Sequence, residues 1–135
     1  MCQSKLDKYE IEIKNTRDLK DIYKFSLGLL LEERYYPLAY LHQGMESILA
    51  KSRIGYQINR FGSMISLHFT NTAVKDFASA AKGDNQTFKK YFHGMLKRGV
   101  YLPPSAFESY FLNDATSYKD LDTTLEAFSE TLKEL

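Results

Sequence analysis

The sequence predicts an α+β domain, a two-layer sandwich in which helices cover one face of a small antiparallel or mixed sheet. Around residues 56–70 the apolar and polar residues alternate with the period of a strand. Before and after this region, apolar residues recur instead at the spacing of a helix. Strands that are bunched together and flanked by helices favour a two-layer α+β architecture.

Residues 1–39 begin with a short alternating stretch. The sequence "YEIEI" at residues 9–13 places apolar and charged side chains on opposite faces of a predicted strand. Asn15 or Thr16 can then cap a helix whose apolar residues recur at helical spacing. We expect residues 1–39 to form a leader, a strand plus a helix whose origin the sequence leaves open, and residues 40–135 to form the domain itself.

The middle of the chain predicts a helix followed by a hairpin. An apolar stripe of helical spacing follows Pro37, and Gly55 ends this segment. Two strands within residues 56–70 are then expected to meet at Gly62, because glycine adopts backbone angles that other residues resist.

The next predicted helix is capped by Asp84 or Asn85 and closed by Gly99. One face of this helix is expected to carry five apolar residues, namely Phe88, Tyr91, Phe92, Met95 and Leu96. The "VYL" segment at residues 100–102 is predicted to be a short third strand.

The last helix is predicted to begin at Ser117, with Asp120 as the acidic partner in its first turn. Its buried stripe is expected to consist of Leu121, Leu125, Phe128 and Leu132.

The segment between the third strand and the last helix contains an isolated carboxylate in an aromatic setting. Pro103 and Pro104 fix the backbone in an extended conformation and donate no hydrogen bond, so the strand must end before them. Ser105 precedes Glu108 by three residues, the spacing of a capping box. The spacing leaves two interpretations open: Glu108 caps a short helix, or it is a carboxylate on a rigid loop that points into a cleft.

Charge and composition exclude several classes of function. Eighteen basic and seventeen acidic residues give a net charge of +1, which provides no electrostatic basis for binding nucleic acid or an anionic membrane. The longest apolar run, residues 27–31, is far too short to span a membrane. The single cysteine, Cys2, cannot form an intrachain disulfide, so a cytoplasmic location is expected.

The three histidines, His42, His68 and His93, lack the spacing of metal ligands, so no metal site is expected. Ser105 has no nucleophile-elbow context, so the sequence does not support a catalytic triad either.

Two long segments carry a resemblance to a known family. The sequences "NRFGSMISLHFT" at residues 59–70 and "FKKYFHGMLKRGVYLPPSAFESYFLNDATSYKDLDTTLEA" at residues 88–127 resemble the C-terminal end of glutamate-1-semialdehyde 2,1-aminomutase. That family belongs to the class III, fold-type-I aminotransferases, which use pyridoxal phosphate. The resemblance extends from about residue 40 to the end of the chain. Ala106 departs from it, since the family most often has glutamine there.

The resemblance implies the fold and the origin of the chain. It implies the small C-terminal domain of a fold-type-I enzyme that isomerises glutamate-1-semialdehyde to 5-aminolevulinate in tetrapyrrole biosynthesis. In the family, the lysine that forms the Schiff base and most phosphate contacts belong to a large upstream domain. The chain by itself is therefore expected to bind no pyridoxal phosphate and to be inactive, with the large domain or a second copy as its partner.

The resemblance also implies a role for Glu108 as the carboxylate at the substrate end of the active-site cleft. Ser63, Met64 and Ser105 are weaker candidates for lining that cleft. A strand-initiating turn with core packing is the competing interpretation of Ser63 and Met64. An alternative function stays open for the whole chain, namely a non-catalytic α+β module that self-associates or binds a partner protein.

Overall fold

The structure is a computed structural model that describes residues 37–113 and 115–135. The strand predicted at residues 9–13 and the helix predicted after Asn15 or Thr16 lie outside the described residues. The domain boundary between residues 39 and 40 stays a prediction.

The sheet has three antiparallel strands in the order β1-β2-β3. The strands are β1 (Gln57–Phe61), β2 (Met64–His68) and β3 (Tyr110–Phe111). The turn between β1 and β2 contains Gly62 with a φ of 60°, a conformation that a Cβ disfavours. The predicted hairpin and its glycine are therefore confirmed.

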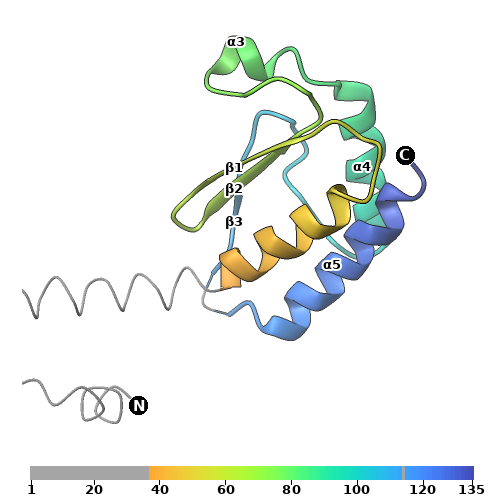
Figure 1. Ribbon diagram of the computed structural model, residues 1–135. Helices are drawn as coiled ribbons and strands as arrows, with labels where there is room; N and C mark the ends of the chain where they lie inside the picture. Colours follow the sequence, from red (N-terminus) through yellow and green to blue (C-terminus); the bar gives the residue numbers. More distant parts are fainter. Residues whose placement is uncertain (1–36, 114) are drawn as a thin grey trace, which may run out of the picture. The chain divides into compact units, whose positions relative to one another are not determined.

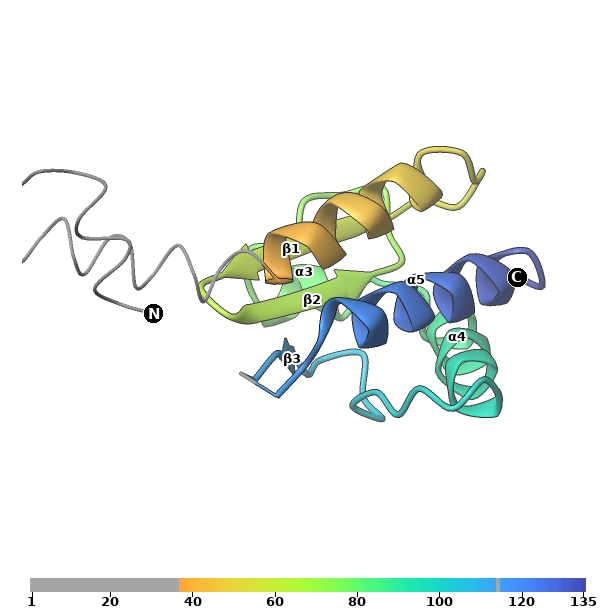
Figure 2. The same ribbon diagram turned by 90° about the horizontal axis from the view of Figure 1, so that it is seen from below.

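Three of the helices lie on the same side of this sheet (Figure 1). They are the helix at residues 37–49, α4 (Asn85–Lys97) and α5 (Tyr118–Leu132). The helix at residues 37–49 runs beside α5 in both views (Figures 1 and 2). This arrangement confirms the predicted α+β fold with helices on one face of a small antiparallel sheet.

The predicted capping residues are found at the ends of α4 and α5, whereas the helix at residues 37–49 ends six residues before Gly55, which was predicted to end it. The Asp84 side chain accepts hydrogen bonds from two backbone N–H groups in the first turn of α4, so Asp84, and not Asn85, is the cap. Ser117 and Asp120 form a reciprocal capping box at the start of α5. Gly99 follows α4 with a φ of 81°, as expected of a residue that terminates a helix.

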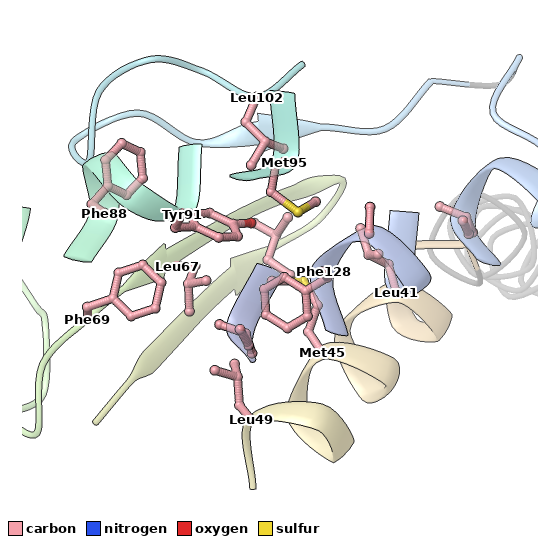
Figure 3. Close-up of a cluster of buried hydrophobic side chains, with 14 of the residues drawn as sticks. Leu41, Met45, Leu49, Leu67, Phe69, Phe88, Tyr91, Met95, Leu102 and Phe128 are labelled. Atoms are coloured by element: carbon pink, nitrogen blue, oxygen red, sulfur yellow. The ribbon is translucent and has the colours of Figure 1, made fainter. Parts of the chain in front are cut away.

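The core lies between the sheet and the helices, with Tyr91 of α4 pointing into it (Figure 3). The Tyr91 ring makes edge contacts with Phe69 and Phe128, at centroid distances of 5.4 and 5.7 Å. Of the five residues predicted on one face of α4, Phe88, Tyr91 and Met95 are buried, Phe92 is half-buried and Leu96 is exposed. On α5, Leu121, Phe128 and Leu132 are buried, whereas Leu125 is half-buried.

The third strand was predicted in the wrong place. Residues 100–102 form a loop, and the strand that pairs with β2 is β3. In this loop Tyr101 is exposed and Leu102 is buried, so the side chains alternate as they would in a strand. Alternation reports only the direction of side chains, and here no neighbouring strand pairs with the backbone.

Two further local features differ from the prediction. The short helix α3 (Phe77–Ala80), capped by Asp76, was not predicted. No helix follows Ser105, so the predicted capping box is wrong. The Ser105 hydroxyl instead accepts a hydrogen bond from the Phe107 backbone N–H at 3.2 Å, and the Ser105 carbonyl accepts one from Glu108 N–H at 3.1 Å. The chain makes only a single turn here, because the backbone is extended again at β3.

None of the helices in residues 37–113 and 115–135 has the length and apolar character needed to cross a lipid bilayer.

Candidate functional site

A pocket of about 560 Å³ lies between the helices and the segment that leads into β3. Its walls come from the helix at residues 37–49, from α4 and α5, and from residues 100–112. Most of the lining is apolar, and it includes Leu41, Met45, Met95, Leu102, Leu121 and Phe128. A pocket of this size with a few polar groups is typical of a small-molecule site.

Glu108 is the charged residue of this lining, and among the described lining residues it is the only one. Pro103 lines the same pocket, so the rigid proline segment and the carboxylate lie at one site. Glu108 is exposed, and within the described residues its carboxylate makes no hydrogen bond or ion pair. A free carboxylate beside an apolar wall can accept charge-assisted hydrogen bonds from an ammonium group.

Two tyrosine hydroxyls lie in the same lining. Tyr91 Oη of α4 and Tyr110 Oη of β3 are 3.4 Å apart. Burial raises the pKa of Tyr110 to about 12, and burial together with the Tyr110 hydroxyl raises the pKa of Tyr91 well above its ordinary value. Both phenols are therefore neutral hydrogen-bonding groups at physiological pH.

Sequence reasoning missed this tyrosine pair as part of the site. The two residues are 19 positions apart and share no motif. The available indication was Tyr91 itself, because a tyrosine on a buried helix face requires a partner for its hydroxyl.

The weaker candidates lie near Glu108 along the chain or the sheet but do not line the pocket. Ser63 is exposed in the β1–β2 turn, and its carbonyl accepts a hydrogen bond from Leu112 N–H at 3.4 Å. Met64 pairs with Phe111 across the β2–β3 ladder. Ser105 forms the turn before Glu108. The contacts of Ser63, Met64 and Ser105 therefore hold β3 and the loop before it in place.

The described part of the chain offers no group of three or more His, Cys, Asp or Glu side chains that could hold a metal ion. No lysine or arginine is among the described residues that line the pocket. The described lining residues therefore include no amine for a Schiff base and no lysine or arginine to bind a phosphate group.

A solved structure with this architecture is an omega-transaminase from Sphaerobacter thermophilus, with a TM-score of 0.61 and 15% sequence identity. The alignment covers 76% of this chain and 24% of that one. The chain thus has the fold of a region of the class III transaminases.

The sequence relatives are more specific. The chain is 50% identical over 103 residues to glutamate-1-semialdehyde 2,1-aminomutase from Flavobacterium johnsoniae, and 48% identical over 105 residues to the enzyme of that name from Flavobacterium psychrophilum. It is homologous to the C-terminal part of this aminomutase family. The matched regions cover 76% and 78% of the chain but only 23% and 24% of the two relatives. No family model matches the chain.

Proposed function

We propose that this chain is the C-terminal domain of an enzyme that converts glutamate-1-semialdehyde to 5-aminolevulinate, and that Glu108 is its contribution to the active site. The observation that carries the proposal is the 50% identity over 103 residues to an aminomutase. The pocket supports it, because its charged lining residue is the same Glu108 to which the sequence resemblance assigns a role.

In this proposal Glu108 binds the ammonium group of the substrate. A carboxylate at the edge of an apolar pocket attracts an ammonium more strongly than one surrounded by water, because the local dielectric constant is lower. The same carboxylate can accept a proton from the ammonium group, which leaves a neutral amine with a lone pair free to react. The apolar walls lie on one side of this contact, and the exposed Glu108 needs a covering partner to shield its other side from water.

Pyridoxal phosphate is the cofactor that the family implies, and it would supply the electron sink for moving an amino group. The described pocket residues do not fit it by themselves, since they include no lysine or arginine. We therefore assign the cofactor site to the large domain of the complete enzyme.

The surface around Glu108 supports a partner that covers it. Phe107, Phe111 and Tyr101 belong to the same segment and are 46%, 68% and 74% exposed. Phe107 also packs against exposed Phe77 of α3, with a centroid distance of 5.2 Å. Contiguous exposed aromatic side chains mark interaction surfaces. We propose that the partner is the large cofactor-binding domain or a second copy of the enzyme.

The second candidate function is a non-catalytic module that self-associates or binds a partner protein. The absence of a lysine from the described pocket lining favours it for the chain alone. An absorbance spectrum with added pyridoxal phosphate discriminates between binding as a Schiff base at a specific site, which gives a saturable visible band, and a module without such a site.

A chimera tests the proposed function. In the Flavobacterium johnsoniae relative, the matching region is replaced by residues 37–135 of this chain, and formation of 5-aminolevulinate is measured. We expect activity well above that of the same relative with the region deleted. A chimera that shows the cofactor absorbance of its parent but forms no product would contradict the proposal.

A further inference from the structure

A second groove lies on the other side of α4 and shares no lining residue with the pocket of Glu108. Its volume is about 490 Å³, and it runs between α4 and the C-terminal end of α5. Its α4 wall is formed by Gln86, Lys89, Lys90, His93, Gly94 and Lys97, and its α5 side by Thr131, Glu134 and Leu135.

The α4 wall carries a row of basic side chains. Lys89, His93 and Lys97 are spaced four residues apart, so they project from one face of the helix. With a rise of about 1.5 Å per residue, the row extends over about 12 Å. Lys90 flanks it. Basic residues repeated at this spacing repel one another, so the row by itself does not stabilise α4.

Acidic residues do not neutralise this row. Among the described residues, no carboxylate lies within salt-bridge distance of Lys89, Lys90 or Lys97. Glu134 lines the groove, but it is bound to Arg98 with an N–O distance of 2.5 Å. The charge of Glu134 is thus compensated mainly by Arg98, which lies outside the lining, and the three lysines of the described lining outnumber its one acidic side chain.

The base of the groove is set by a close approach of the two helices. A Cβ on Gly94 would lie 2.5 Å from Cγ2 of Thr131, so the glycine allows α5 to approach α4 at this point. Thr131 is 1% exposed, and its hydroxyl has no hydrogen-bond partner among the described residues. The Thr131 oxygen is itself closed off from solvent, so it belongs to the contact between the helices and is not a ligand-binding group of the groove.

We propose that this groove binds a small polyanion that carries two or more phosphate or carboxylate groups. Lysine ammonium groups bind such oxygens through charge-assisted hydrogen bonds. Three lysines and a histidine along one wall can contact several anionic groups of one molecule, and the groove volume suits a small ligand. The ordinary solvated face of an amphipathic helix would explain the lysines, but not the groove that they line. The site is independent of the reaction proposed above.

The test uses the full 135-residue chain, labelled with nitrogen-15, at low ionic strength, where surface charges are weakly screened. Inorganic tripolyphosphate and citrate are titrated separately, and amide shifts are followed. We expect saturable shifts confined to α4 and the end of α5. A response to tripolyphosphate alone assigns a phosphate ligand, a response to citrate alone a carboxylate ligand, and a response to both the shared chemistry.

The double variant Lys89→Gln/Lys97→Gln should weaken binding by about tenfold or more, since two hydrogen bonds to charged groups are removed. The matched control is Lys51→Gln/Lys75→Gln, which removes the same charge from two exposed lysines outside the groove. Its affinity should stay within about twofold of the parent, because distant surface charges contribute little. Absence of saturable binding, or an equal loss in both double variants, would overturn the proposal.

Discussion

The hydroxyl oxygens of Tyr91 and Tyr110 lie 3.4 Å apart and connect the helical layer to the strand that follows Glu108. Tyr91 belongs to α4 and is buried in the core of the domain. Tyr110 is the first residue of β3, two residues after Glu108. This contact therefore couples the position of the Glu108 segment to the packing of the helices. It matters because β3, the strand that follows Glu108, is only two residues long.

Removing either hydroxyl of the pair should destabilise the domain, and removing the second hydroxyl should then cost less than removing the first. Tyr110→Phe leaves the buried Tyr91 hydroxyl without its partner, and we expect a loss of about 1 kcal/mol in unfolding free energy. Tyr91→Phe should cost a similar amount. The double variant should lose less than the sum, because the two changes remove one shared interaction. Urea unfolding of the three variants measures this, and strict additivity would contradict the contact.

The same pair predicts how the tyrosines titrate. Burial raises the pKa of Tyr110 to about 12 and raises that of Tyr91 well above its ordinary value of 10.0. Because the folded-state pKa is the higher one, the folded domain keeps the phenol proton to a higher pH than the unfolded chain does. The stability that depends on the neutral phenol is therefore fully present below pH 10 and is lost as the pH rises through 12. Tyrosinate absorbance should therefore show a late-titrating component that Tyr110→Phe reduces. Titration of every tyrosine near its ordinary pKa would contradict the burial.

His68 predicts a pH dependence on the acid side. The imidazole is 8% exposed in β2, and burial lowers its pKa below its ordinary value of 6.5. The unfolded chain therefore binds a proton more readily than the folded one. Stability should be greatest above pH 6.5 and should fall as the pH drops from 6.5 toward the folded-state pKa.

Unfolding free energies measured at several pH values, for the parent and for His68→Gln, check this. The variant should lose the part of the acid slope that lies just below neutrality. His93→Gln, which changes an exposed histidine of α4, is the matched control. An identical slope in the parent and in His68→Gln would show that the imidazole contributes nothing.

The helix packing predicts a difference between two phenylalanines. Phe128 is 1% exposed and packs against Tyr91, whereas Phe92 is only half-buried, at the edge of the core. Phe128→Ala should cost about 3–5 kcal/mol, as expected of a phenylalanine truncated inside a core. Phe92→Ala should cost clearly less, because the site can partly fill with water. Thermal or urea unfolding that gave equal losses would show that the two positions are equally buried.

The features that the sequence predicted correctly are those determined locally. Asp84 and Ser117 cap their helices through hydrogen bonds to the next few residues, so their chemistry lies within one turn. Gly62 acts in the same way in the hairpin, where the turn conformation itself requires it. Such signals need no knowledge of the rest of the fold.

The features that failed depend on residues distant in the sequence. Residues 100–102 have the alternation of a strand, but the backbone that pairs with β2 is β3, and only the tertiary structure decides between them. The contact of Tyr91 with Tyr110 is hidden for the same reason. Glu108 became a candidate through resemblance, because its spacing from Ser105 left open both a helix cap and a carboxylate that points into a cleft, and the helix does not form.

The sharpest prediction concerns Glu108 in the active chimera described above. Glu108→Gln keeps the size of the side chain and removes its charge. Glu108 is exposed and follows a turn that is held by backbone groups and the Ser105 hydroxyl, so stability should change by less than about 1 kcal/mol. Turnover should fall about 10- to 1000-fold, the range expected when one positioned group for hydrogen bonding or proton transfer is lost.

Glu126→Gln serves as the control, because Glu126 is an exposed carboxylate of α5 that does not line the pocket. Turnover and the unfolding midpoint are measured on the same preparations of all three proteins. Loss of stability with unchanged turnover would make Glu108 a structural residue of its loop. Loss of turnover with unchanged stability, in Glu108→Gln alone, would place the carboxylate in the active site, because the proline segment beside it would then hold a reacting group and not a folding contact.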